Sequence, residues 1–317
     1  MLPVKKLRLG VAGLGRAFQA MAPAFGDPRV EVVAGADLQR KEFQGKFFDS
    51  VEALCRSDLD VVYVATPHPL HAEHACLAAA HGKHVLVEKP MATSLEDARR
   101  MIDAARKAGV QLIVGHSHSF DLPVRKTSEL IRDGAYGKLR MITMLNFTDF
   151  LTRRRREPFD TAILNQGAHQ VDIARLLAHD RISSVRAHAA GEGAYSALVG
   201  FEGGVCASLV YSGHGHFDSD ELMGGVGEMG SPQHHQHFGF LIASCERADL
   251  RPLPDGVMIY EGKAQRLERL PPPQRPRAEV IDELCDAVLL KKKPLHDGEW
   301  GMATLEACLA MQSRMAE

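Results

Sequence analysis

The sequence predicts two domains, a doubly wound α/β domain with a parallel sheet and then an α+β domain built on a largely antiparallel sheet. The chain has 317 residues, enough for about two domains at ~150 residues each. Strand-like and helix-like segments alternate over the first third, which is typical of a parallel sheet covered on both faces. Longer alternating segments with glycine turns follow, and these favour antiparallel pairing. We therefore expect domains at residues 1–120 and 121–317.

In the first domain, strands and helices are expected to follow one another through short turns. Apolar residues alternate over 7–11 into a glycine-rich turn, and an apolar helical stretch covers 17–25. Thr93 and Glu96 predict a capping box at the start of a helix that Gly109 ends in a left-handed conformation. Further strands are expected at 30–37, 60–67, 83–90 and from 110, and further helices from 51 and over 71–81.

The second domain is expected to be dominated by a sheet. A helix over about 124–133 leads into the first of several alternating segments, and Gly203-Gly204 punctuates two of them like a hairpin turn. Two helical stretches are expected after residue 278, on either side of the segment KKKPLHDGEW. The expected strands lie within 138–150, 183–190, 194–201 and 204–212.

Composition excludes several classes of protein. The 38 Lys and Arg residues nearly balance 40 Asp and Glu, and a net charge of −2 argues against a nucleic-acid binder. No run approaches the ~18 apolar residues of a membrane span, so we expect neither insertion nor secretion. The six cysteines are scattered, which favours reduced thiols in the cytoplasm.

The turn after the first expected strand predicts dinucleotide binding. Gly13 and Gly15 match the first two glycines of the fingerprint, which allow a tight turn and a close approach to pyrophosphate. Phe18 stands where a small residue is usual, so the pattern alone is weak. Its position after a strand and before a helix strengthens it, and a purely structural turn is the alternative.

Asp37 lies at the end of the second expected strand, where a carboxylate accepts hydrogen bonds from the adenosine ribose. It favours NAD because it would repel a 2′-phosphate. Arg40 and Lys41 follow closely enough to keep NADP as an alternative.

Two further motifs are candidates for the chemistry. Lys89, in Glu88-Lys89-Pro90 at the carboxyl end of a strand, can donate a charged hydrogen bond to a substrate hydroxyl. The segment from Asn165 to Asp172 is expected to open a helix, on which Asn165, His169 and Asp172 share one face, and a histidine accepts a proton near neutral pH. A strand-end lysine and a capping or core histidine are equally good interpretations of the spacing alone.

Clusters of histidine and of arginine are candidate ligand sites. The groups 68–74, 214–216 and 234–237 lack the spacing of a defined zinc site, so we expect no metal. Arg153 and Arg154 belong to a run of four arginines, which is either a solvated loop or a grip for an anionic substrate.

Taken together, these motifs resemble the Gfo/Idh/MocA (glucose-fructose oxidoreductase / inositol dehydrogenase) family. The resemblance implies a Rossmann domain followed by an α+β domain whose sheet commonly forms an oligomer interface, giving a homodimer or homotetramer. The segments that carry it are GVAGLGR, VVYVATPHPLHAEHACLAAAHGKHVLVEKPMATSLEDARRMIDAA, LIRDGAYGKLR, NQGAHQVDIARLL and PLHDGEWGMATLEACLAM.

The family pattern implies residue roles. Lys89 matches the lysine of the E-K-P motif and His169 the catalytic histidine, while Asn165 stands where an aspartate is frequent and can orient a hydroxyl but not take its proton. Asp172 joins Arg153 and Arg154 as a candidate substrate contact. The residues implied to bind the cofactor are Gly13, Gly15, Arg16, Asp37, Thr66, Pro67, His71 and Glu88.

Within the family, HSHSFDLPVRKTSELIR, LNFTDFLTR, YSGHGHFDSDEL and CERADLRPLPDGVMIY are most similar to phthalate 4,5-cis-dihydrodiol dehydrogenases. The resemblance implies NAD(P)-dependent oxidation of a ring alcohol on a small, anionic substrate in aromatic catabolism. The alternatives are a sugar or inositol dehydrogenase, and a dinucleotide-binding sensor without turnover. At 317 residues the chain is short for this subgroup, with the shortfall expected before Asn165 and around 191–194 and 231–236.

Overall fold

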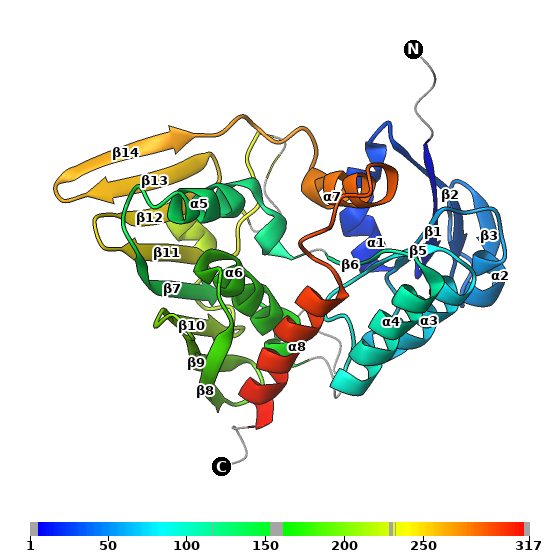
Figure 1. The fold of residues 1–317 in the computed structure, drawn as a ribbon, viewed down its shortest axis with the longest axis horizontal. Helices are drawn as coiled ribbons and strands as arrows, with labels where there is room; N and C mark the ends of the chain where they lie inside the picture. Colours follow the sequence, from blue (N-terminus) through cyan, green and yellow to red (C-terminus); the bar gives the residue numbers. More distant parts are fainter. Residues whose placement is uncertain (1–5, 116, 153–160, 228–230, 232, 314–317) are drawn as a thin grey trace. The chain divides into compact units, whose positions relative to one another are not determined.

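The computed structural model describes residues 6–115, 117–152, 161–227, 231 and 233–313 (Figure 1). Contacts divide the chain into two compact units. Unit 1 comprises Met1–His116 and Arg277–Leu305, and unit 2 comprises Ser117–Pro276 and Glu306–Glu317. The sequence predicts a single domain boundary between residues 120 and 121, whereas in the structure residues 277–305 belong to unit 1. The reason is local: the backbone amide of Val114 donates to the carbonyl of His296, 2.8 Å away.

Unit 1 is built on a six-stranded sheet in the order β3-β2-β1-β4-β5-β6, with parallel pairing throughout. This confirms the predicted doubly wound sheet, because the order is that of dinucleotide-binding folds. The central β4 segment VVYV is fully buried, which explains its uninterrupted apolar sequence. The strands are β1 (Leu7–Ala12), β2 (Val30–Ala36), β3 (Lys46–Phe48), β4 (Val61–Val64), β5 (His84–Val87) and β6 (Leu112–Val114).

The helices of unit 1 connect these strands, and α3 packs beside α4 (Figure 1). They are α1 (Arg16–Met21), α2 (Val51–Cys55), α3 (His71–Ala80), α4 (Leu95–Ala108) and α7 (Ala278–Leu289), with α8 (Gly298–Ser313) crossing the division between the units in the chain. The expected helix over 17–25 is wrong in its length, because α1 ends at Met21 and Pro23 then begins a separate 3-10 turn.

The capping box of α4 lies one residue later than expected. Ser94, not Thr93, is the N-cap, and its hydroxyl oxygen accepts from the backbone N–H of Asp97 at 3.1 Å. Ser94 has the extended backbone of a cap, and Asp97 therefore takes the third helical position that was assigned to Glu96. The predicted left-handed stop at Gly109 is confirmed, with φ of 67°.

Unit 2 contains an eight-stranded sheet in the order β14-β13-β12-β11-β7-β10-β9-β8. Its pairs are antiparallel except β7 with β10, which confirms a largely antiparallel sheet. The strands are β7 (Leu139–Phe147), β8 (Ile182–Ala190), β9 (Ala194–Phe201), β10 (Cys206–Ser212), β11 (Phe240–Cys245), β12 (Asp249–Leu253), β13 (Gly256–Glu261) and β14 (Ala264–Arg269).

Two helices, α5 (Leu122–Arg132) and α6 (Ala168–Ala178), cover one face of this sheet (Figure 1). α5 contacts β12 and β13, and α6 contacts β7 and β10. Strand residues alternate accordingly: Leu209 and Tyr211 of β10 are buried, while Leu198 of β9 and Met141 of β7 remain 51% and 46% exposed. The second sheet face therefore carries exposed apolar side chains.

The position of the α4 cap can be tested by substitution. We expect Ser94→Ala to lower the free energy of unfolding by about 1 kcal/mol, because it removes the hydroxyl that satisfies the Asp97 amide. Thr93→Ala is the matched control and should change stability by less than half as much. Urea denaturation measures both, and a larger effect at Thr93 would return the cap to the residue predicted from sequence.

Candidate functional site

The turn between β1 and α1 has the geometry of a dinucleotide-binding turn. Gly13 has φ of +95°, and a Cβ atom there would lie 2.6 Å from the carbonyl oxygen of Ala65. Only glycine therefore lets this turn pass the end of β4. A Cβ at Gly15 would meet nothing within 4 Å, which leaves its backbone open to a ligand. Arg16 follows, exposed, at the start of α1.

Phe18, the departure from the fingerprint, has a packing role. Its ring lies 6.2 Å from that of Phe25 and 6.0 Å from that of Phe43. Apolar neighbours thus accommodate a large ring where a small residue is usual.

Asp37 follows β2 and is tied to the glycine turn. Its Oδ2 accepts from the backbone N–H of Leu14 at 2.9 Å and from Nζ of Lys41 at 2.7 Å. Burial opposes ionisation, but the Lys41 hydrogen bond and backbone amides hold the pKa of Asp37 below its ordinary value. An ionised carboxylate at this strand end suits a ribose diol and repels a phosphate. Lys41 also donates to the carbonyl of Leu14 at 3.2 Å, so its ammonium is shared between two local acceptors.

The loops after β4 and β5 are joined by His71. Its Nδ1 lies 2.9 Å from the carbonyl oxygen of Pro90 and its Nε2 lies 2.8 Å from that of Thr66. The ring is completely buried. A neutral imidazole has one N–H, so the ring donates to one of the two carbonyl oxygens and packs against the other. His71 thereby lies between the Thr66-Pro67 turn and the segment that carries Lys89. The structure therefore gives His71, which was predicted to bind the cofactor, contacts with the backbone of both loops.

Two histidines beside Lys89 are held neutral. Burial lowers the pKa of His68 to about 3 and that of His71 to about 4, and positive charge on Lys89 acts in the same direction on both. Their rings meet edge to face at 5.5 Å between centroids. Near neutral pH, the imidazoles of His68 and His71 beside Lys89 are therefore uncharged.

Glu88, directly after β5, is buried. Its Oε1 accepts from the hydroxyl of Tyr63 on β4 at 2.6 Å. Burial, followed by the Glu88 charge, raises the pKa of Tyr63 well above its ordinary value, so the phenol stays a donor. Tyr63 therefore fixes the orientation of the Glu88 carboxylate, and the half-buried Lys89 follows it directly.

In unit 2, the expected single α-helix is interrupted at its start. Ile163–Gly167 form a π-helical turn, in which the N–H of Ala168 donates to the carbonyl of Ile163, and α6 begins only at Ala168. The α-helical spacing argument thus applies to His169 and Asp172 but not to Asn165. Such turns are frequent at functional sites.

The three predicted polar residues have different surroundings. Asn165 is half-buried and its Oδ1 accepts from Nε2 of Gln166 at 3.0 Å. His169 is 5% exposed. The Asp172 carboxylate accepts from the hydroxyl of Ser119 and lies 4.0 Å from Arg175, which gives it partners inside the fold.

The His169 ring is part of a buried aromatic cluster. Its centroid lies 4.9 Å from that of His118 and 4.8 Å from that of Phe238. His118 in turn places Nδ1 2.6 Å from Oδ2 of Asp121. His118, Asp121 and Phe238 are not among the residues predicted from the sequence. The His-x-x-Asp spacing at 118–121 was the one available signal, and it is too common to identify a site.

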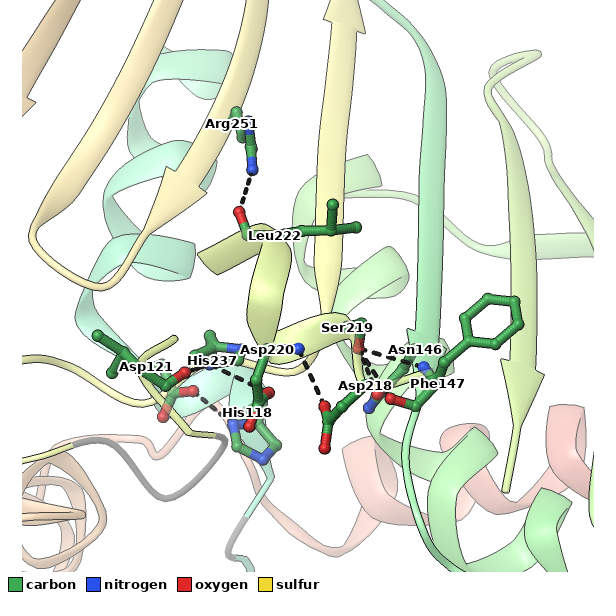
Figure 2. A network of polar contacts seen from close by, with 11 residues as sticks. His118, Asp121, Asn146, Phe147, Asp218, Ser219, Asp220, Leu222, His237 and Arg251 are labelled. Carbon is green, nitrogen blue, oxygen red and sulfur yellow. Dashed lines mark hydrogen bonds and ion pairs between the residues drawn. The ribbon is translucent and has the colours of Figure 1, made fainter. Parts of the chain in front are cut away.

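Polar contacts around the turn η5 (Ser219–Met223) support this cluster (Figure 2). Ser219 donates to Oδ1 of Asn146 at 3.0 Å and accepts from the N–H of Phe147 at 3.2 Å. Asp220 lies 3.5 Å from Nε2 of His237, the residue before Phe238. The network thus fixes the backbone that presents the Phe238 ring.

Other predicted groups are placed as follows. Arg153 and Arg154 lie outside the described residues, so their contact with substrate stays a prediction. His214 and His216 are exposed, while His235 contacts the carbonyl oxygen of Pro271 at 2.8 Å. Within the described ranges, no three His, Cys, Asp or Glu side chains converge as metal ligands. No helix among these residues is long and apolar enough to cross a membrane.

The parallel sheet, the open glycine turn and the ionised strand-end carboxylate define unit 1 as a dinucleotide-binding domain. Residues 7–116 match the model of the oxidoreductase family with an NAD-binding Rossmann fold, and residues 124–231 match the GFO/IDH/MocA C-terminal domain. The chain belongs to the Gfo/Idh/MocA oxidoreductase family, and it is an NAD(P)-dependent dehydrogenase by class.

Individual relatives agree with this assignment. A 1-carboxy-3-chloro-3,4-dihydroxycyclohexa-1,5-diene dehydrogenase from Comamonas testosteroni is 41% identical, over 96% of this chain and 94% of that protein. An inositol 2-dehydrogenase from Klebsiella pneumoniae is 33% identical over 44% of this chain and 41% of its own length. The structure of a putative dehydrogenase from Bordetella bronchiseptica superposes with a TM-score of 0.91 at 34% identity, covering 98% of each chain.

The alignment with the Comamonas protein spans 372 positions and this chain has 317 residues, so at least 55 positions of the alignment are gaps in this chain. That relative therefore carries inserted residues, in line with the expected shortness of this chain within its subgroup.

The buried state of His71 predicts a pH dependence of stability. Its folded pKa of about 4 lies below the ordinary 6.5, so the unfolded chain binds the extra proton between these values. The free energy of unfolding should fall by roughly 3 kcal/mol from this group as the pH drops from 6.5 to 4.

We expect His71→Gln to be less stable at pH 7 and to show a shallower decline with acidification. Urea denaturation at a series of pH values measures the slope, with His188→Gln on the exposed side of β8 as control. An unchanged slope in His71→Gln would contradict the burial argument.

Proposed function

We propose that this dehydrogenase oxidises a ring cis-dihydrodiol that bears a carboxylate, with phthalate 4,5-cis-dihydrodiol as the best candidate. The observation that carries the proposal is the 41% identity, over 96% of the chain, to a dehydrogenase named for a carboxylated dihydroxycyclohexadiene. Loss of two hydrogens from such a ring leads to an aromatic catechol, which makes the oxidation strongly favourable. This assigns the enzyme to aromatic catabolism.

His169 is the proposed acceptor of the hydroxyl proton. An imidazole takes a proton near neutral pH, and burial among rings limits exchange with bulk water. Asn165, in the π turn before α6, is assigned to orient the hydroxyl because an amide does not take its proton. Asp172, Arg153 and Arg154 remain proposed substrate contacts, the two arginines as partners of the substrate carboxylate.

Lys89 is proposed to hydrogen-bond the same hydroxyl oxygen. A lysine with an ordinary pKa near 10.4 is a charged donor rather than a base, so it stabilises negative charge that develops on the oxygen. Bound NAD supplies the acceptor for the hydride from the adjacent carbon. Gly13, Gly15, Arg16, Asp37, Thr66, Pro67 and Glu88 are the residues proposed to hold it, with His71 between the loops that carry two of them.

We further propose that NAD is preferred to NADP. The support is the lowered pKa of Asp37 and the engagement of Lys41 with Asp37 and Leu14. The six cysteines form no disulfide, which supports a place in the cytoplasm.

A second candidate substrate class is a polyol, favoured by the similarity to inositol 2-dehydrogenase over 44% of the chain. The same lysine and histidine would serve a sugar or inositol ring. A sensor that binds NAD without turnover is the alternative outside catalysis.

Turnover with purified protein distinguishes these functions. We expect NAD reduction with phthalate cis-dihydrodiol and little with myo-inositol or glucose. Lys89→Ala and His169→Ala should each lower kcat/KM at least about 100-fold, because each removes a group that acts on the reacting oxygen. NADH binding, followed by fluorescence, should stay unchanged in both and exceed NADPH binding in the wild type.

Lys107→Ala and His188→Ala, which alter exposed side chains on α4 and β8, are the controls. Reduction with the polyols alone would replace the aromatic substrate. Full activity in both Lys89→Ala and His169→Ala would overturn the residue roles, and binding without turnover on any substrate would favour the sensor.

We propose that the exposed face of the eight-stranded sheet forms a homodimer or homotetramer. Leu198 and Met141 on this face are 51% and 46% exposed, which is unfavourable unless a second copy covers them. Leu198→Glu should shift the sedimentation coefficient toward that of a monomer, with Leu290→Glu on an exposed position of unit 1 as control. A wild type that sediments as a monomer would refute the assembly.

A further inference from the structure

A second buried histidine lies beside the proposed base. His118 and His169 are 2% and 5% exposed, and their rings meet at a steep angle of 66° with 4.9 Å between centroids. Phe238 contacts both rings, at 5.1 Å from His118 and 4.8 Å from His169. The proton transfer proposed above uses only His169, so it leaves His118 without a role.

His118 is paired with a buried carboxylate. Oδ2 of Asp121 lies 2.6 Å from Nδ1 of His118, and Asp121 is 4% exposed (Figure 2). Asp121 also occupies the N-cap of α5, where an aspartate ordinarily accepts from the backbone amides of the first turn. Its side chain makes no such capping bond. The Asp121 carboxylate contacts the His118 imidazole instead of capping α5.

This pairing determines what His169 experiences. A carboxylate in hydrogen-bond contact favours the protonated form of an imidazole. Burial opposes a charge on both groups, and the 2.6 Å contact offsets that cost when the imidazole is protonated and the carboxylate ionised. In that state the ring that His169 contacts is the positive member of the pair. A neighbouring positive charge disfavours a proton on His169, and burial strengthens the effect because little water screens it.

Other ionisable groups surround the cluster and are fixed by partners. Asp172 accepts from Ser119, and Asp220 lies 3.5 Å from His237. The helices and strands packed against α6 carry further ionisable groups: Arg175 on α6 itself, Cys206 and Tyr211 on β10, Arg140 on β7, and Arg125, Lys126, Glu129 and Arg132 on α5. Lys126 is paired to Glu268 at 2.9 Å, and Arg140 to Glu246.

We propose that the His118–Asp121 pair is a positioning unit that presents a positive imidazole to His169 and so keeps His169 deprotonated near neutral pH. The inference rests on the proposed function only in giving His169 the role of proton acceptor. The electrostatic coupling itself follows from the geometry of unit 2. Phe238, anchored next to His237, closes the cluster and holds the two rings in contact.

The coupling can be measured without any substrate. In the full-length protein labelled with ¹⁵N-histidine, ring resonances are titrated by NMR, and His169 is assigned by the signal lost in His169→Gln. We expect His118→Gln to raise the pKa of His169 by about one unit or more, because it removes the positive ring and leaves the Asp121 charge. Asp121→Asn should raise it less, since both members of the pair become neutral.

The double variant His118→Gln/Asp121→Asn is the decisive comparison. It restores the zero net charge of the native pair, so the His169 pKa should fall back by at least half of the His118→Gln shift. His188→Gln is the control for histidine loss elsewhere in unit 2. An unchanged or lowered His169 pKa in His118→Gln would overturn the proposal. A raised pKa that the double variant does not lower again would show that the charge of Asp121 has no part in the coupling.

A kinetic arm links the pair to turnover. With the dihydrodiol as substrate, the acid limb of the pH profile of kcat/KM should shift to higher pH in the variants. The variants should rank by this shift as they rank by the His169 pKa measured by NMR. Normal titration shifts in a protein that oxidises no dihydrodiol would refute the proposed function and leave the pair intact. A profile that stays fixed while the His169 pKa moves would show that His169 is not the proton acceptor.

Discussion

Parallel pairing of the six strands of unit 1 brings the carboxyl ends of those strands to one edge of the sheet. Gly13 follows β1, Asp37 follows β2, Thr66 follows β4 and Lys89 follows β5. Residues that are far apart in sequence therefore lie at one edge of the sheet, because parallel pairing alone brings the strand ends together. The buried ring of His71 then lies between two of these loops and contacts a carbonyl oxygen of each. The residues proposed to bind the cofactor depend on this shared edge.

Unit 2 achieves its arrangement by different means. Its strands pair mostly in antiparallel fashion, so no single edge collects its functional groups. The polar residues come instead from a helix, α6, and from two segments that reach its N-terminal end, at 118–121 and 237–238. The 118–121 segment contains the buried His118–Asp121 contact, and His237 contacts the carbonyl oxygen of Val226 and the carboxylate of Asp220. Buried polar groups are costly to leave unpaired, so these contacts are specific.

The sequence predicted the features that follow from local pattern. Strand and helix alternation, the glycine turn, Asp37 at a strand end and the stop at Gly109 depend on neighbouring residues, and the structure has each of them. The capping box shifted by one residue because Thr93 and Ser94 are both good caps, and only the backbone angles choose between them. The four strands β11 to β14 were not singled out, since Gly256 and Gly262 break the segment into short hairpin arms. His118, Asp121 and Phe238 were missed because their importance arises from contacts across 50 to 120 residues of chain, which no local pattern encodes.

The π turn before α6 has a consequence for how this helix can vary. A π turn holds one residue more than an α turn, so the segment Ile163–Gly167 amounts to a single-residue insertion absorbed within a helix. Deleting one residue there would restore α geometry and rotate everything upstream by about 100° around the axis, while His169 and the rest of α6 kept their packing. Asn165 would then point in another direction. One insertion or deletion in this turn could therefore redirect the Asn165 side chain while the position of His169 on α6 stayed the same.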